Sequence, residues 1–163
     1  MLTQLKYEMI QYERGCPSRI QHFLKVHSFA KLIGEKEGLD EHTLFILEST
    51  ALVHDIGIKN AKIKYGSSAG PYQEKEGEIE ARPLLEKLGY DPTDIDRICY
   101  LVGHHHTYNM VDGIDYQILL EADYLVNSFE HEHESQEVIY KMLNNVFKTK
   151  TGKDLLITQF DLK

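Results

Sequence analysis

Apolar residues recur every three or four positions along most of the chain, the spacing that places them on one face of an α-helix. This pattern predicts helices at about residues 2–12, between Pro17 and Gly38, between Asp40 and Gly57, at about 73–88, from Asp91-Pro92 through the run His104-His105-His106, after Asp112-Gly113, and at about 134–148. Residues 149–163 are expected to form a short helix or a packed tail.

The breaks between these segments carry residues that begin or end helices. Asp40 is a typical N-cap, while Gly38, Gly57 and Gly89 follow the last residue of an apolar stripe. Residues 59–72 contain several glycines and serines, which predicts an exposed loop. Alternating apolar runs flanking a hairpin turn are absent, so the expected fold class is an all-α bundle of about six to seven helices.

Length and charge narrow the classes of function. A chain of 163 residues is the size of one domain, and we expect residues 1–163 to form one, with a core at about 20–128 and C-terminal helices at 129–163. Eighteen Lys and Arg against 26 Asp and Glu give a net charge of −8. This balance argues against general nucleic-acid binding but allows a small phosphorylated substrate that is bound by a local positive centre.

The apolar runs and the two cysteines bear on the expected location of the protein. The longest apolar stretches fall far below the roughly 18 residues needed to cross a bilayer, so we expect no membrane partner. Cys16 and Cys99 form no C-x-x-C pair, which argues against a disulfide framework and a thiolate zinc site. A cytoplasmic location is the expectation.

Several histidine and aspartate residues, which are candidate metal ligands, occupy positions where a polar side chain is not needed for folding. His54-Asp55 falls at the end of a predicted helix, where adjacent side chains can turn toward one ion. Asp123 shares an apolar helix face, where an unpaired carboxylate would be costly, and His27 replaces an apolar residue on an inward stripe. An imidazole and carboxylate set suits Fe, Mn, Zn or Ni.

In order along the chain, His27, His54-Asp55-Ile56-Gly57, His104-His105 and Asp123 resemble the HD-domain superfamily of metal-dependent phosphohydrolases. The likeness covers about residues 20–128. It implies an HD-like all-α bundle in which His27, His54, Asp55 and Asp123 hold a divalent ion.

Members of that family with two metals carry further ligands, which leaves one or two ions open here. His104 and His105 match the later histidine pair of such members. Where those members have a histidine before a glycine, this chain reads Glu74-Lys75-Glu76-Gly77, so Glu76 or Glu74 is the candidate replacement. The Gly-Tyr-Pro of the cyclic-dinucleotide phosphodiesterase branch is missing, which disfavours that branch.

These features predict that the protein hydrolyses a phosphate ester, a nucleotide or a related small phosphorylated molecule, with a metal-activated water. We expect Asp55 and His104 to act in catalysis, with Lys59 at the start of a basic cluster that meets the substrate phosphate. Two alternatives stay open: a di-iron oxygenase of HD type, and a non-catalytic sensor or binding domain stabilised by its metal. The stretch 131–134, His-Glu-His-Glu, is interpreted as solvated charge.

Overall fold

The computed structural model describes residues 1–131 and 134–163, and every regular element within these ranges is an α-helix. The all-α prediction is confirmed, although the helices are more numerous than the six to seven expected. They are α1 (Leu2–Tyr12), α2 (Pro17–Lys36), α3 (Glu41–Val53), α4 (Ile58–Tyr65), α5 (Gly70–Lys87), α6 (Pro92–Val102), α7 (Ile114–Glu130), α8 (Gln136–Asn145) and α9 (Lys150–Phe160).

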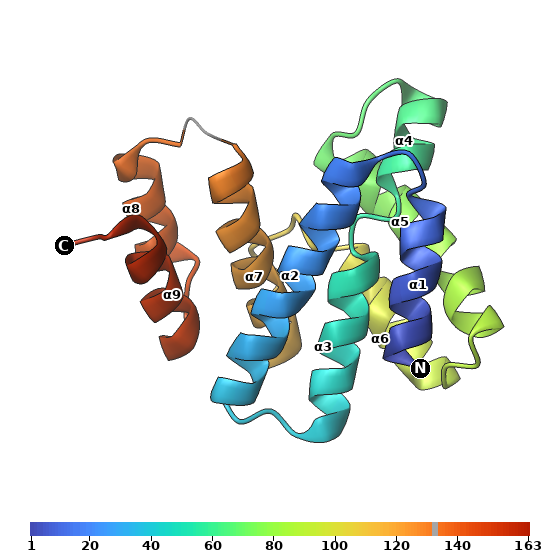
Figure 1. Cartoon of the computed structure of the whole chain (residues 1–163), viewed down its shortest axis with the longest axis horizontal. Coiled ribbons are helices and arrows are strands. Elements are labelled where there is room, and N and C mark those ends of the chain that lie inside the picture. The colour runs from blue at the N-terminus through green and yellow to red at the C-terminus, as the bar shows by residue number, and fades with distance from the viewer. Residues whose placement is uncertain (132–133) are drawn as a thin grey trace.

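The bundle is built around α3 and α7, which are buried on all sides. Residues 46–53 of α3 are all buried, and α7 is buried along nearly its whole length. In Figure 1, α2 lies with these two in the middle, α1, α4, α5 and α6 lie toward one end, and α8 and α9 lie at the other, where α9 contacts α7. A helix that is buried on every face has no polar, solvent-facing side. A polar residue on such a helix therefore needs a hydrogen-bond partner, an ion or a functional role.

The predicted helix caps account for the helix ends. The Asp40 carboxylate accepts hydrogen bonds from the backbone N–H groups of His42 and Thr43, which satisfies two free donors at the start of α3. At the other end of that helix, Val53 is the last residue and His54 is the C-cap, so the helix ends before the stop at Gly57 expected from the sequence. The dipeptide His54-Asp55 therefore lies in a turn of residues 54–57 and not within a regular helix.

Two differences from the prediction bear on the site. The loop expected at 59–72 contains α4, because residues 58–65 carry no breaker and Gly66, with φ of 64°, ends the helix in the left-handed conformation that glycine adopts freely. Helix α6 ends at Val102, so residues 104–106 follow in a turn. The tail expected after residue 148 forms α9, which is capped by Thr149.

No helix in the described part of the chain is both long and apolar enough to cross a membrane.

Candidate metal centre

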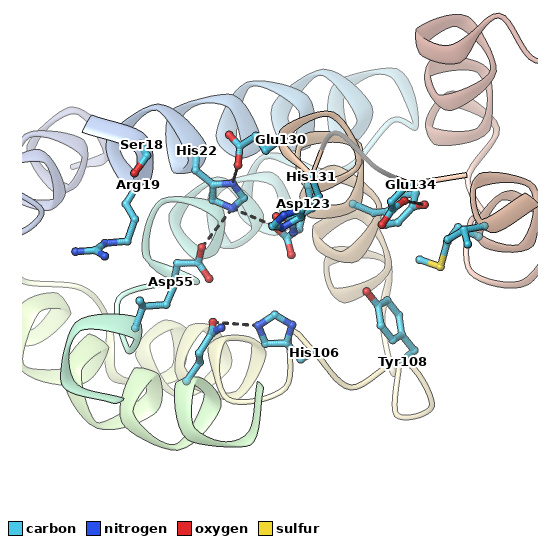
Figure 2. A pocket seen from close by; sticks show the side chains of 16 residues that line it. Ser18, Arg19, His22, Asp55, His106, Tyr108, Asp123, Glu130, His131 and Glu134 are labelled. Atoms are coloured by element: carbon cyan, nitrogen blue, oxygen red, sulfur yellow. Dashed lines mark hydrogen bonds and ion pairs between the residues drawn. The ribbon is translucent and has the colours of Figure 1, made fainter. Parts of the chain in front are cut away.

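Two helices and one turn bring four side chains to a single point. His22 Nε2 of α2 lies 3.2 Å from His54 Nε2 and 3.3 Å from Asp55 Oδ2, while Asp123 Oδ1 of α7 lies 3.2 Å from His22 Nε2 and 3.4 Å from His54 Nε2. His54 Nε2 also lies 3.4 Å from Asp55 Oδ2. Figure 2 shows His22, Asp55 and Asp123 turned toward one another. We call these four residues the inner group.

The hydrogen bonds of the two imidazoles decide which nitrogen faces the centre. The Nδ1–H of His54 donates to the carbonyl oxygen of Ala51 at 2.8 Å, and that of His22 donates to the Glu130 carboxylate at 2.8 Å. With the proton on Nδ1, a neutral imidazole presents the Nε2 lone pair. Two lone pairs and two carboxylates thus face one another, an arrangement that requires a shared cation or protons.

The pKa values express the same conflict. Burial acts to lower the pKa of His54, but the neighbouring Asp55 and Asp123 carboxylates outweigh it and raise that pKa well above its ordinary value. Burial acts to raise the pKa of Asp123, but hydrogen bonds from His22 and His54 hold it well below its usual range. In the absence of a metal, protons on the imidazoles take the place of a cation.

A second group of possible ligands shares Asp55 with the inner group. The turn that follows α6 carries His105 and His106, and ligand atoms of these two residues and of Asp55 lie within 4.8 Å of one another. The Nδ1–H of His105 donates to the Val102 carbonyl at 2.8 Å. His105 Nε2 is buried and has no hydrogen-bond partner among the described residues, and Asp55 Oδ1 lies 3.4 Å from it. We call His105, His106 and Asp55 the outer group.

Both groups fit divalent ions. Ligand atoms about 2.1 Å from a common centre lie roughly 3.0 to 3.4 Å apart, which matches the spacing of the inner group. A buried imidazole nitrogen without a partner is costly unless something binds it. The imidazole and carboxylate donors suit Fe, Mn, Zn or Ni. His22, His54, Asp55 and Asp123 would hold one ion, and Asp55 with His105 and His106 a second.

The histidine turn is held by neighbouring helices. Glu74 of α5 accepts hydrogen bonds from the His106 N–H at 2.9 Å and from the Thr107 hydroxyl at 3.1 Å, and the Tyr116 hydroxyl of α7 donates to the His104 carbonyl at 2.6 Å. The His106 Nε2–H donates to Gln73 Oε1 at 3.0 Å, which leaves Nδ1 available. The turn is therefore fixed from two sides before any ligand binds.

A cavity of about 550 Å³ opens onto the metal centre (Figure 2). Its wall includes four residues of the two groups: His22, Asp55, His106 and Asp123. The other described lining residues come from α2, α4, α5, the 103–113 loop, the end of α7 and α8: Ser18, Arg19, Ile58, Gln73, Tyr108, Tyr124, Asn127, Glu130, His131, Glu134, Val138 and Met142.

His27, expected from the sequence to be a metal ligand, lies apart from both groups. Its Nε2 lies 2.9 Å from the Glu48 carboxylate of α3, and it belongs to neither group. Five residues of helix rotate by about 140°, so His22 and His27 face different neighbours. Helix α2 is buried over an arc wide enough to include both, and the single apolar stripe used in the sequence prediction contained only His27.

His104 and Glu76 also lie outside both groups. His104 stacks on Tyr100 with ring centroids 4.2 Å apart and donates from Nδ1 to the Tyr100 carbonyl. The Glu76 carboxylate is buried and accepts hydrogen bonds from Lys64 Nζ at 2.6 Å and from the Tyr65 hydroxyl at 3.0 Å. His106 stands where His104 was expected, because the three histidines lie in a turn and not on one helix face.

The basic group in the cavity is Arg19, in place of the lysine cluster. Lys59 lies over the ring of Tyr12, 5.0 Å from its centroid, and Lys64 binds Glu76. Arg19 Nε donates to the Glu13 carboxylate at 2.7 Å. Arg19 lies three residues before His22, the helical spacing at which two side chains share a face, and this is the sequence signal that would have identified it.

The stretch interpreted as solvated charge also contributes to the site. His131 and Glu134 line the cavity, while Glu132 and His133 lie outside the described residues. The sequence pattern could not predict this contribution, because residues in a loop between two helices follow no helical spacing.

Comparison with known proteins identifies the family. A family model described as HD domain matches residues 19–142, so the chain belongs to the HD domain family. The resemblance found in the sequence is confirmed. The protein therefore has the fold of an HD superfamily hydrolase and contains a candidate His/Asp metal site.

A solved structure shares the fold. The chain is similar to the crystal structure of a predicted HD superfamily hydrolase from an uncultured Thermotogales bacterium, with a TM-score of 0.68 and 20% sequence identity over 98% of this chain and 83% of that one. No curated protein matches the chain.

Proposed function

We propose that this protein is a metal-dependent phosphohydrolase that cleaves a phosphate ester by attack of water. The observation that carries the proposal is the position of Asp55, whose two oxygens face two different groups of ligands: Oδ2 lies near His22 and His54, and Oδ1 lies near His105. A carboxylate between two adjacent cation sites suits phosphoester hydrolysis, because paired ions stabilise both the attacking and the leaving oxygen.

A bound divalent ion would lower the pKa of water toward neutrality and polarise a phosphoryl oxygen. The chain itself supplies the remaining parts. Arg19 lines the same cavity as His22, Asp55 and Asp123, and a guanidinium there can pair with phosphoryl oxygens. His106, hydrogen-bonded to Gln73, also lines the cavity, and burial together with His105 lowers its pKa to about 4, so at neutral pH it is uncharged and can bind an ion.

Purified protein without a histidine tag tests the proposal. We expect metal analysis to find one or two divalent ions per chain, and a panel of nucleotides and general phosphoesters to include at least one that is hydrolysed. His22→Ala and Asp55→Ala should each abolish turnover and remove metal, because each deletes a ligand from a buried cluster.

His27→Ala is the matched control, since His27 is a buried histidine of the same helix that contacts Glu48. We expect it to keep its metal. Full metal content in His22→Ala, or inertness of the loaded protein toward the whole panel, would contradict the proposal. Two irons with turnover that depends on dioxygen would instead establish the oxygenase alternative.

A further inference from the structure

The cavity wall carries few positive charges that could bind phosphate. Of the described residues that line the cavity, Arg19 alone carries a permanent positive charge, and it is already paired with Glu13. Beyond the metal ligands the wall carries two carboxylates. Glu130 is paired with Lys25 at 2.6 Å and with His22, whereas Glu134 accepts a hydrogen bond from the neutral hydroxyl of Tyr124.

This balance limits the number of phosphoryl groups that the cavity accepts. One phosphoryl group would be held by the ions bound to the two groups and could pair with Arg19. A second or third would lie against a wall that offers no further fixed cation among the described lining residues and that includes Glu134. Like charges in a confined cavity repel strongly, so the wall disfavours a phosphate chain.

The end of the cavity near α8 is apolar and aromatic. Val138 and Met142 stand four residues apart on one face of α8 and line the cavity, as do Tyr108 and Tyr124. Tyr108 is 48% exposed and Val138 41% exposed, so both side chains are accessible to a ligand in the cavity. In Figure 2, Arg19 and Tyr108 lie toward opposite ends of the cavity, with Asp55 and Asp123 between them.

The cavity has room for more than a phosphoryl group. Its volume of about 550 Å³ lies within the roughly 300–1,000 Å³ of pockets that enclose whole small molecules. Flat aromatic groups bind well between tyrosine rings and aliphatic side chains, because they bury much area with little loss of freedom.

We propose that the site selects a phosphate ester with a single phosphoryl group and an uncharged aromatic group, a nucleoside monophosphate being the matching class, with the aromatic group bound between Tyr108 and α8. This inference rests on the proposed function for the position of the phosphoryl group. It adds the choice of substrate and the residues that make it.

Equilibrium binding tests the inference independently of turnover. Calorimetry at a fixed free Mn²⁺ concentration would compare adenosine 5′-monophosphate, adenosine 5′-diphosphate and ribose 5-phosphate. We expect the monophosphate to bind at least about 10-fold more tightly than either of the others, since the diphosphate adds charge and ribose 5-phosphate lacks the aromatic group.

Variants of Tyr108 test the proposed position of the aromatic group. Tyr108→Ala should remove about 5- to 10-fold of the preference for adenosine 5′-monophosphate over ribose 5-phosphate, while Tyr108→Phe keeps it. Tyr108 is half exposed, so its loss should leave the thermal midpoint nearly unchanged. Tyr7→Ala is the matched control, since Tyr7 is an exposed tyrosine of α1 and does not line the cavity.

Each result decides the matter. Equal affinity for the three compounds, tighter binding of the diphosphate, or an unchanged preference in Tyr108→Ala would overturn the inference, even if phosphoesters are hydrolysed. Absence of hydrolysis for all phosphoesters would overturn the proposed function, and the binding preference would still decide whether the cavity recognises an aromatic monophosphate.

Discussion

Glu130 shows how a single residue at the end of a helix can prepare a ligand on another. It stands seven residues after Asp123 on α7, which is two turns, so both carboxylates project toward α2. Asp123 faces the Nε2 of His22, and Glu130 binds its Nδ1–H. Two other imidazoles face Asp55, those of His54 and His105, and both donate to backbone carbonyls. Only the partner of His22 is a side chain, Glu130, which a substitution can change.

Glu130→Gln should weaken metal binding about 10- to 100-fold, the usual cost of losing a carboxylate partner behind a histidine ligand. Glutamine keeps a hydrogen-bond acceptor but loses the charge that makes the imidazole more basic. Titration calorimetry with Mn²⁺ measures the effect. Glu134→Gln is the control, because Glu134 lines the same cavity but binds Tyr124. Equal losses in the two variants would contradict a specific role for Glu130.

His27 gives a pH-dependent prediction that separates it from the metal ligands. Burial, followed by the charge of Lys6, lowers the pKa of His27 despite its contact with Glu48. A histidine that stays neutral when folded gains a proton only on unfolding, so its contribution is complete above the unfolded pKa of about 6.5 and is lost as pH falls below it.

The free energy of unfolding of His27→Gln should therefore fall less than that of the unaltered protein between pH 7 and pH 5.5. The difference is at most about 1.4 kcal/mol per pH unit, the limit for one proton. Urea unfolding at several pH values measures it. A larger loss in the variant than in the unaltered protein on acidification would show that His27 is protonated in the folded state.

At the scale of helices, the contact between the 54–57 turn and α5 positions Asp55. A Cβ on Gly57 would lie 2.3 Å from the carbonyl oxygen of Gln73 and 2.4 Å from the nitrogen of Gly77, so only glycine allows the turn to approach α5 this closely. Gln73 and Glu74, which bind the histidine turn, belong to the same helix. The inner and outer groups are thus brought into register through one close backbone contact.

Gly57→Ala should lower the free energy of unfolding by about 1–3 kcal/mol, because backbone atoms must move apart to admit the methyl group. It should also weaken metal binding, since Asp55 moves with the turn. Gly77→Ala is the graded comparison: its Cβ would meet the Val102 side chain at 2.7 Å, and a side chain can yield more easily than backbone. Thermal unfolding with and without Mn²⁺ measures both. A smaller loss in Gly57→Ala than in Gly77→Ala would contradict this account.

Across the whole molecule, a cation at the centre would tie together segments that are distant in the chain. The ligand atoms come from α2, the turn after α3, the turn after α6, and α7, and these helices include the two that are most deeply buried. Metal binding would therefore be coupled to folding, because an ion that binds only the folded state stabilises it.

Removal of metal should destabilise the protein more at high pH than at low pH. In the metal-free protein, burial acts to lower the pKa of His22, but Asp123 and Asp55 raise it overall, and the pKa of His54 is raised as well. Raised imidazole pKa values stabilise the fold fully below about pH 6.5 and lose that contribution as pH rises through the folded values. At higher pH only a metal ion offsets the facing carboxylates.

Thermal unfolding with and without a chelator at pH 6 and pH 8 measures this. With free Mn²⁺ at about 100 times its Kd, we expect metal to raise the midpoint by about 5–10 °C at pH 8, and by less at pH 6 where protons compete. An equal shift at both pH values would contradict competition between protons and metal. No shift at either would contradict a buried metal site.

The helical class, most helix ends, the HD family resemblance and the importance of His54, Asp55 and Asp123 follow from the sequence, because apolar periodicity, capping residues and a carboxylate on an apolar face are local signals. His105 also follows from its place in a histidine run. The specific roles of these residues as metal ligands stay predictions.

Only the tertiary structure distinguishes His22 from His27, and His106 from His104. Both choices depend on which direction a side chain points, and that direction is set by the wide burial of α2 and by the end of α6 at Val102, before the histidine run. The cavity is decided in the same way, since Arg19, Tyr108 and Glu134 meet only after helices far apart in the chain have packed. Spacing along one helix describes its own faces, whereas the identity of the neighbour on each face is a property of the packed bundle.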